Sequence, residues 1–437
     1  MKGSVSIRGA SLVLEDRIEE GDLRVEDGVI VAVGGDCPGR GIEEIDATGL
    51  TLMPGVIDAH VHFREPGLTH KEDLKSGSAA AVRGGVTAFH EQPNTKPAAT
   101  SQAQIDAKRS LASGRSYAHY GFYIGATLDN LADLKSATRT PGIKIFVGSS
   151  TGNMLVDDQN VLEAIFAETR LPICVHAEEE SLVMANFERL KDRTDALAHS
   201  SVRTPEAAAR SVARVCDLAV RHEHRLHILH VSTTDELAAL VDHPCVSAEI
   251  CYPHLFLDTD AYERLGCQAK INPALRSPEE RHAMWPALRS GRFMTIGSDH
   301  APHLLEEKAA GYPGAPSGMP SVEMGLPLML DASHRGEISL PRLVQLMCTN
   351  PAKVWNIPRK GRLAVGYDAD LVLVDRNQTR VVRNEDQWTR CGWSAWHGSE
   401  LVGWPVRTLI MGKTVVQNDS LVSEPTGSAL VYTDQQS

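Results

Sequence analysis

The chain has 437 residues, with 44 lysines and arginines against 56 aspartates and glutamates, which gives a formal charge of −12 at pH 7. Hydrophobic residues make up 42% of the chain and charged residues 23%, which is the balance of a folded globular protein and excludes a disordered one. The acidic surplus argues against nucleic acid or an anionic membrane as a partner. No stretch approaches the roughly 18 consecutive apolar residues of a membrane span.

The N-terminal sequence and the cysteines indicate the compartment. The N-terminus lacks the continuous apolar region of a secretory signal. The eight cysteines are scattered and form no CxxC pair, which is typical of reduced thiols rather than of a disulfide framework. We therefore expect a cytoplasmic protein.

The two ends of the chain share a β-rich pattern. Short alternating runs separated by turn residues predict strands at residues 5–7, 11–14, 22–25, 29–33, 370–374 and 408–416. We expect residues 1–50 and 355–437 to form one small composite β-sandwich domain.

Between these ends, short apolar runs alternate with helical stretches. The runs are residues 56–62, 86–90, 120–124, 143–147, 172–176, 226–231, 246–250, 268–271 and 294–299, and the helical stretches include 72–83, 155–168, 205–221, 234–241 and 278–288. Such alternation predicts a parallel α/β architecture, and a TIM-like (β/α)8 barrel over residues 51–354 is the simplest arrangement. Nine runs exceed the eight that a barrel needs, so we expect one of them to be an extra strand in a loop.

Several of these runs end in residues that bind metals. His60 and His62 lie two positions apart and so share one face of a strand, while His176, His230 and Asp299 end three other runs, and Lys144 lies inside an apolar run. A lone histidine at a strand end is more often a hydrogen-bonded core residue, and a lone lysine is usually an edge or ion-pair residue. Together, however, they would meet at the carboxyl-terminal rim of a barrel, and imidazole and carboxylate are ligands that zinc prefers. The pattern therefore predicts a metal site.

Four motifs carry a resemblance to a known family. They are residues 58–67 (DAHVHFREPG), 92–95 (QPNT), 270–276 (KINPALR) and 298–303 (SDHAPH). In this order they resemble the signature of dihydroorotases, in the cyclic amidohydrolase branch of the amidohydrolase superfamily. The resemblance runs through the whole expected barrel.

The resemblance implies a binuclear zinc centre. By analogy, His60, His62 and Asp299 hold one zinc, and His176 and His230 hold the other. A carboxylated Lys144 and a hydroxide would bridge the two ions. Some dihydroorotases have aspartate in place of this lysine, so the carbamate is a prediction to be tested.

The resemblance also assigns roles in catalysis and substrate binding. Asp299 would accept the proton of the attacking water and pass it to the departing nitrogen. Arg64 shares the face of His62 and could grip a carboxylate in bidentate fashion, although a structural ion pair with Glu65 or Glu72 is the alternative. The other expected substrate contacts are His62, Asn94, Asn272, His303 and Gly318, with residues 311–320 as a mobile loop over the site or a plain surface turn.

These features predict a dihydroorotase that interconverts N-carbamoyl-L-aspartate and L-dihydroorotate in pyrimidine synthesis, with a small anionic substrate and a homodimeric state. The alternatives are an allantoinase, a dihydropyrimidinase or hydantoinase, and an inactive dihydroorotase-like assembly subunit. Gln92 and the single His254 depart from the family pattern and bear on fine specificity. His199 and His224, among other histidines in helical or loop surroundings, are expected at the surface.

Overall fold

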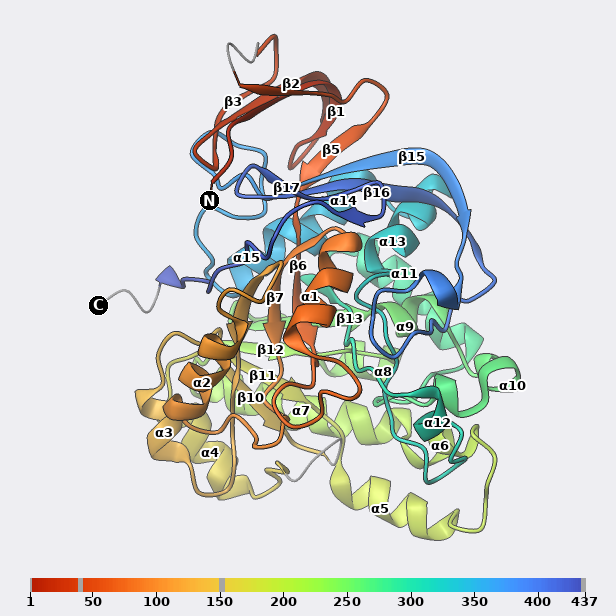
Figure 1. Cartoon of the computed structure of the whole chain (residues 1–437). Coiled ribbons are helices and arrows are strands. Elements are labelled where there is room, and N and C mark those ends of the chain that lie inside the picture. Colours follow the sequence, from red (N-terminus) through yellow and green to blue (C-terminus); the bar gives the residue numbers. More distant parts are fainter. Residues whose placement is uncertain (1, 38–41, 149–153, 434–437) are drawn as a thin grey trace.

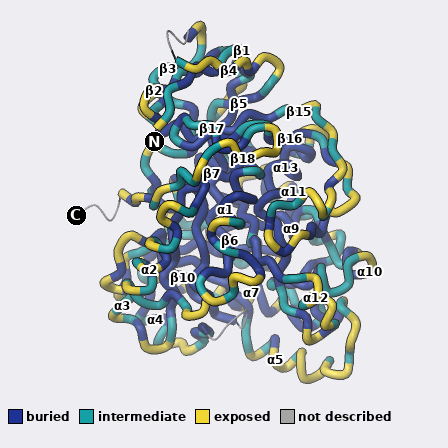
Figure 2. The backbone as a smooth tube through the Cα atoms, viewed as in Figure 1, coloured by how far each residue is buried: buried dark blue, intermediate teal, exposed yellow. Residues whose placement is uncertain are grey.

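The computed structural model describes residues 2–37, 42–148 and 154–433, which form a barrel with a large sheet across one end (Figure 1). The burial pattern places the core inside the barrel and beneath the sheet, while exposed residues follow the outer helices and the sheet edges (Figure 2). Among the described residues, no helix is long and apolar enough to cross a membrane.

The barrel is a ring of short parallel strands. Its members are β6 (Val56–Val61), β7 (Val86–Glu91), β8 (His119–Phe122), β9 (Ile124–Gly125), β10 (Ile143–Phe146), β11 (Ile173–His176), β12 (Leu226–Ile228), β13 (Val246–Cys251) and β14 (Thr295–Gly297). They form two arcs in the order β6-β7-β8 and β9-β10-β11-β12-β13-β14, and every pair within them is parallel. Since only Tyr123 separates β8 from β9, these two pieces occupy one barrel position, and the expected (β/α)8 barrel is confirmed.

Side-chain and backbone hydrogen bonds join β14 to β6. The His62 amide donates to His300 O at 2.8 Å, and the Ser298 amide donates to the buried Asp58 Oδ1 at 3.1 Å. Ser298 Oγ also donates to His60 O at 3.2 Å. The first and last strands therefore meet around the His60–His62 segment.

Helices and single turns cover the barrel and connect its strands. They are α1 (Leu74–Arg83), α2 (Gln102–Ala112), α3 (Leu131–Ser136), α4 (Gln159–Glu168), α5 (Glu180–Arg189), α6 (Ala198–Val202), α7 (Pro205–Arg221), α8 (Thr234–Ala239), α9 (Tyr252–Phe256), α10 (Ala261–Leu265), α11 (Pro278–Ser290), α12 (Leu305–Lys308), α13 (Gly325–His334), α14 (Leu340–Val344) and α15 (Asn350–Val354). Helix α7 matches the predicted range because its start is capped by the Thr204 side chain, with Pro205 in the first turn. It buries an apolar face that includes Val212 and Val215 against the barrel.

One predicted strand is wrong. Residues 268–271 form no strand; the first half of this run ends a 3-10 turn (Gly266–Ala269) and the second half lies in a loop. A four-residue apolar run cannot distinguish a strand from another buried segment. Here the Lys270 carbonyl accepts from the Gly318 amide at 2.9 Å, so this backbone pairs with a loop and not with the barrel.

The large sheet contains strands from both chain ends, as expected. Among the described residues it has nine strands: β1 (Val5–Val13), β2 (Ile18–Glu26), β3 (Val29–Val33), β4 (Glu43–Asp46), β5 (Thr51–Pro54), β15 (Leu371–Val381), β16 (Glu400–Ile410), β17 (Lys413–Gln417) and β18 (Ser420–Leu421). The two ends join where β5 runs antiparallel to β15, with Leu52 opposite Leu373. A core that includes Ile7, Leu52 and Leu373 lies against this junction.

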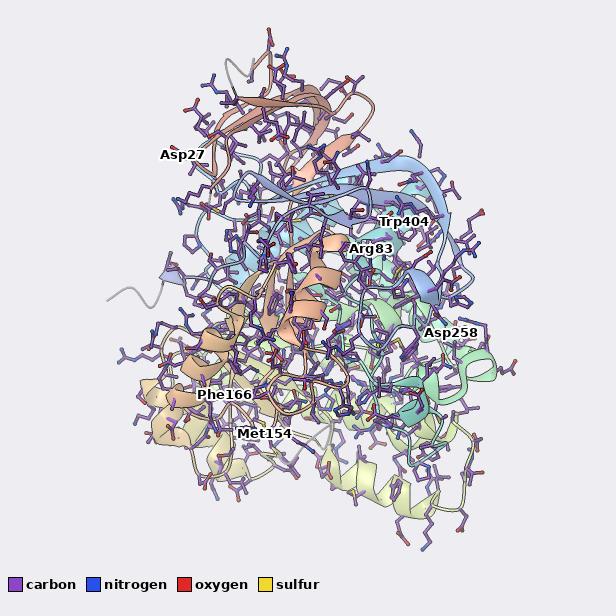
Figure 3. The ribbon with its side chains drawn as sticks, viewed as in Figure 1. Asp27, Arg83, Met154, Phe166, Asp258 and Trp404 are labelled. Atoms are coloured by element: carbon purple, nitrogen blue, oxygen red, sulfur yellow. The ribbon has the colours of Figure 1, made fainter. Side chains whose placement is uncertain are left out.

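The segment after β15 reaches back to the barrel. Trp393 Nε1 donates to His303 O at 2.8 Å, and Glu72 at the start of α1 accepts hydrogen bonds from Thr389 and Arg390. Trp393, Trp396 and Trp404 are buried, so these tryptophans pack within the chain. Arg83 and Trp404 border one surface pocket where the sheet meets the barrel (Figure 3).

Candidate active site

The six predicted metal ligands meet in one cavity at the carboxyl ends of the barrel strands. His60 lies in β6 and His62 just after it, Lys144 lies in β10, His176 ends β11, and His230 and Asp299 follow β12 and β14. All six line a cavity of about 20 Å³, together with Phe146, Asn272, Ser317 and Gly318. We call these six residues the ligand group.

Two of these histidines, His60 and His62, lie close to one oxygen of the Asp299 carboxylate. His60 Nε2 lies 3.3 Å and His62 Nε2 3.1 Å from Asp299 Oδ1. Two ligand atoms on a tetrahedral zinc, each about 2.0–2.1 Å from the ion, are roughly 3.3 Å apart. Burial raises the pKa of Asp299, but the adjacent His60 and His62 outweigh burial and hold that pKa well below its usual range.

The other two histidines face each other. His176 Nδ1 lies 2.9 Å from His230 Nε2, and the ring centroids are 4.7 Å apart. The ring centroid of His60 lies 5.4 Å from that of His230, so the two histidine clusters are neighbours. Burial lowers the pKa of both His176 and His230, which favours neutral imidazoles with lone pairs available for a metal.

Acceptors outside the cavity hold the opposite nitrogens of three of these rings. His60 Nδ1 lies 2.8 Å from Glu249 Oε1, and His62 Nδ1 lies 2.8 Å from Asn94 Oδ1. His176 Nε2 lies 3.0 Å from the buried Glu178 Oε2. The hydrogen bonds of His60 and His62 fix the tautomer and leave the other ring nitrogen available to a metal.

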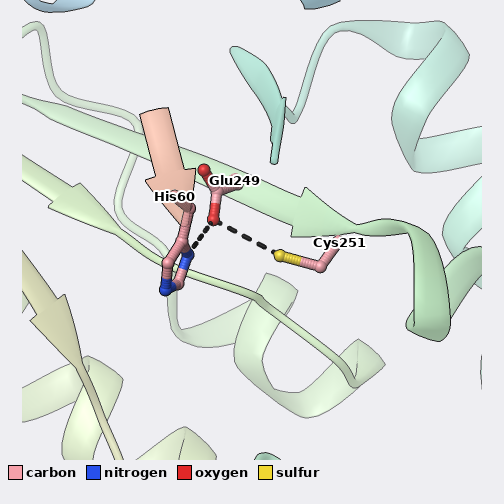
Figure 4. Close-up of side chains that lie close together, drawn as sticks. All are labelled: His60, Glu249 and Cys251. Atoms are coloured by element: carbon pink, nitrogen blue, oxygen red, sulfur yellow. Dashed lines mark hydrogen bonds and ion pairs between the residues drawn. The ribbon is translucent and has the colours of Figure 1, made fainter. Parts of the chain in front are cut away.

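The sequence pattern did not predict Glu249, which lies in the run at residues 246–250. Figure 4 shows His60 from β6 meeting Glu249 from β13, with Cys251 Sγ 3.4 Å from the same Glu249 oxygen. These three groups are close enough to be a candidate metal-binding set. Carboxylate support of a ligand histidine accounts for the Glu249 contact. A carboxylate inside an otherwise apolar strand was the available signal.

Lys144 is a buried amine at the cavity. Its Nζ has no hydrogen-bond partner in the described structure and lies 4.5 Å from the centroid of the Phe146 ring. Burial lowers its pKa to about 8, so a neutral amine is readily accessible. Carbamate formation requires this neutral form, and an unpaired buried nitrogen beside two histidine clusters fits a group that would bind both.

Three residues of the site have positive φ angles without being glycine. They are Arg64 (φ 64°), His230 (φ 40°) and Asp299 (φ 44°). This conformation costs free energy for a side chain that has a Cβ, so it persists only where the surrounding structure holds it. The turns after β6, β12 and β14 therefore direct these side chains at a cost in local stability.

Arg64 is buried next to the ligand group. Its Nε donates to Pro302 O at 3.2 Å, and among the described residues no carboxylate lies within 4.0 Å of its guanidinium nitrogens. The alternative partners are engaged elsewhere, because Glu65 pairs with Arg115 at 2.8 Å and Glu72 accepts from Thr389. Burial lowers the pKa of Arg64 to about 10, so the group stays charged.

His303 links Arg64 to the cavity. Its Nε2 lies 3.1 Å from Arg64 Nη2 and 3.1 Å from Ser317 O. Lys71 Nζ lies 3.0 Å from His303 Nδ1, so two cations that can only donate, Lys71 and Arg64, face the two ring nitrogens of His303. Arg64, Asn94 and His303 thus lie just outside the cavity wall, while Asn272 and Gly318 are part of it.

The expectation that His199 and His224 are surface residues is wrong. Both are buried, and His199 Nε2 lies 2.9 Å from Asn272 Oδ1 and 2.9 Å from Ile271 O. His199 therefore orients a cavity residue, and it was not predicted because α6 packs onto a loop distant in sequence. His254 is buried against Pro273 O and does not line the cavity.

Comparisons with known proteins identify the family of the chain. A sequence model of the amidohydrolase family matches residues 51–415. The chain is 38% identical over 406 residues to a dihydroorotase of Halobacterium salinarum, covering 92% of this chain and 94% of the relative. It is 35% identical over 411 residues to a dihydroorotase of Methanothermobacter thermautotrophicus, covering 92% of each chain.

Solved structures of related enzymes share the whole fold. An L-hydantoinase (dihydropyrimidinase) from Arthrobacter aurescens has a TM-score of 0.92 at 30% identity, covering 98% of this chain and 100% of that one. A dihydropyrimidinase from Brevibacillus agri has a TM-score of 0.91 at 26% identity, covering 98% and 99%.

Proposed function

This chain belongs to the amidohydrolase family, whose members depend on metal ions, and on that basis we propose that it is a dihydroorotase. It would interconvert L-dihydroorotate and N-carbamoyl-L-aspartate in de novo pyrimidine biosynthesis. The observation that carries the proposal is Arg64, a buried guanidinium with no carboxylate partner among the described residues. A buried charge of this kind is costly unless a partner arrives, and the substrate carboxylate would be that partner.

The ligand group would hold two zinc ions. His60, His62 and Asp299 would bind one ion and His176 and His230 the other, with the carbamate of Lys144 bridging them. The support is the spacing of the facing ligand atoms and the unpaired Nζ of Lys144. When bound, the metals would supply Lewis acidity and an activated water.

The protein side chains would position the substrate and move the proton. Asp299 would accept one proton as water adds to the ring carbonyl and return it to the ring nitrogen as the C–N bond breaks, so that the proton count balances. His60 and His62 keep Asp299 ionised, which is the form that can accept a proton. Arg64, Asn94 and His303 would bind the substrate carboxylate, while Asn272 and Gly318 would contact the ring.

The hydantoinase alternative has the support of the solved structures, which share the fold. Fold likeness alone does not select the substrate. A ring without an exocyclic carboxylate would leave Arg64 buried and unpaired. An inactive assembly subunit is disfavoured because all six residues of the ligand group are present and converge.

A substrate panel tests the proposal. The purified protein, with zinc counted per chain, would be assayed for ring opening of dihydroorotate, dihydrouracil, hydantoin and allantoin. We expect turnover of dihydroorotate at a kcat/KM at least about 10²-fold above that of the neutral rings. Turnover of the neutral rings alone would reject the proposal. A carbamate signal after incubation with carbon-13 bicarbonate, lost in Lys144→Gln, would test the bridging group.

We also propose that the enzyme works in the cytoplasm as a homodimer on this small anionic substrate. All eight cysteines are free thiols, six of them buried, which suits a reducing compartment. Analytical ultracentrifugation would test the oligomeric state.

A further inference from the structure

One part of the cavity wall comes from a loop instead of a strand. Ser317 and Gly318 line the cavity and belong to residues 313–318, which we call the wall loop. The cavity of about 20 Å³ is close to the space of one water molecule. The wall loop forms part of the boundary of the space that a substrate ring would occupy.

Two buried lysines hold the wall loop through its carbonyl groups. Lys308 Nζ donates to Pro316 O at 2.8 Å, to Gly318 O at 2.8 Å and to Lys270 O at 3.0 Å. Lys270 Nζ donates to Pro313 O at 2.9 Å and to Ala315 O at 2.5 Å. Four carbonyls of a six-residue loop are therefore bound by two ammonium groups.

The backbone of the wall loop adds to this attachment. The Gly318 amide donates to Lys270 O at 2.9 Å, the same carbonyl that accepts from Lys308. Gly318 has a φ of 132°, and a Cβ there would lie 2.5 Å from Ala301 O, so no larger residue fits. Gly318, at the end of the loop, is thus hydrogen-bonded through both its amide and its carbonyl group.

Both lysines lack a carboxylate partner. Lys308 is 2% and Lys270 7% exposed, and among the described residues no carboxylate oxygen lies within 4.0 Å of either ammonium. The adjacent Glu307 pairs with Lys71 at 2.8 Å instead. Burial lowers the pKa of Lys308 to about 7, which reflects the cost of this placement. Methionine would fill a similar volume without that cost, so packing alone does not explain the charge.

The loop position determines the position of His303. His303 Nε2 lies 3.1 Å from Ser317 O of the wall loop and 3.1 Å from Arg64 Nη2. The chain of contacts therefore runs from Lys308 and Lys270, through the wall loop, to the proposed carboxylate-binding residues. We call Arg64, Lys270 and Lys308 the cation group.

We propose that Lys270 and Lys308 are positioning residues that hold the wall loop so that Ser317 orients His303 and Gly318 faces the substrate ring. This inference rests on the proposed function for its kinetic part. Substrate affinity would then depend on two lysines that lie outside both the metal centre and the cavity lining.

The test uses Lys308→Met and Lys270→Met in the full-length zinc-loaded enzyme. We expect KM for dihydroorotate to rise about tenfold in each variant while kcat stays within about threefold, because the affected step is binding and orientation. The matched control is Lys135→Met, whose ammonium pairs with Glu168 at the surface. Unchanged KM in both lysine variants, with zinc content and melting temperature also unchanged, would overturn the inference.

A double-variant comparison separates positioning from a general structural role. If the lysines act through His303, Lys308→Met combined with His303→Ala should raise KM by clearly less than the product of the two single effects. Multiplicative effects would overturn the route through His303. Rescue of KM by Lys308→Arg, which keeps the charge and the donors, would add support.

Hydrogen exchange tests whether the two lysines hold the wall loop, without an assay of activity. The Ala315 amide donates to Gly311 O at 2.7 Å and the Gly318 amide to Lys270 O, so both should be protected in the parent enzyme. We expect peptides covering residues 311–319 to exchange about tenfold faster in Lys308→Met, with the barrel strands unchanged. Unchanged exchange would reject the inference that Lys308 holds the wall loop, even if the enzyme is active. Absence of dihydroorotase activity in the parent chain would reject the proposed function and leave this result valid.

Discussion

The ligand group and the cation group lie side by side but are supported differently. The ligand group comes from strands and strand ends, and Glu249, Asn94 and Glu178 hold the outer nitrogens of His60, His62 and His176. The cation group comes from loops and a short helix, and its charges meet mainly carbonyl groups. The side chains of the ligand group meet around one cavity, whereas the cation group has no carboxylate partner among the described residues.

We expect the largest effect from a substitution in the ligand group. Asp299→Asn should lower kcat about 10³-fold while KM changes by less than about threefold, because the amide cannot accept and return the proton. Steady-state kinetics with zinc counted per chain would measure this. Asp106→Asn, at a surface ion pair with Arg139, is the control. Equal losses in kcat and in affinity would contradict the assigned role.

Arg64→Met tests the cation side. KM for dihydroorotate should rise about 10²-fold with zinc content unchanged, since a charged, bidentate contact is lost and each tenfold change corresponds to about 1.4 kcal/mol. Isothermal titration with a non-hydrolysable dicarboxylate analogue would measure the loss of affinity, and a metal count would measure the zinc content. Arg139→Met provides a surface control. Loss of zinc would show that Arg64 supports the ligand group, and the ligand group and the cation group would then not be separate in function.

Glu249→Gln tests whether the ligand group depends on its outer support. We expect the zinc dissociation constant to rise about 10–100-fold, because His60 loses the charged acceptor that fixes its tautomer. Activity should return when zinc is added in excess. Metal titration against a competing chelator would measure the change, and unchanged affinity would show that His60 needs no such support.

His199→Phe should give the smallest effect. Loss of the 2.9 Å contact to Asn272 Oδ1 removes a neutral hydrogen bond worth about 0.5–1.5 kcal/mol, so KM should rise about threefold to tenfold. Because His199 does not touch the ligand group, kcat and zinc content should stay as in the parent. A fall in kcat without a change in KM would contradict the assignment.

The sequence predicted the ligand side better than the cation side. His60 and His62 follow from the period of two in a strand, and the barrel brings the other strand ends to the same rim. Arg64 followed from the same period. The support of His60 by Glu249 joins residues 189 positions apart, a separation that no local pattern spans.

The loops were the least predictable part. Lys270 and Lys308 bind backbone carbonyls, which carry no sequence signature, and the run at residues 268–271 is too short to distinguish a strand from a loop. His199 is buried only because α6 packs against the segment that follows Lys270. In each case the partner is a backbone group contributed by tertiary packing.

The hydrogen bond from Trp393 to His303 has a consequence for the order in which the enzyme matures. A ribosome makes His303 ninety residues before it makes Trp393. Trp393 can therefore support His303 only after all the strands and turns that carry the ligand group have been made.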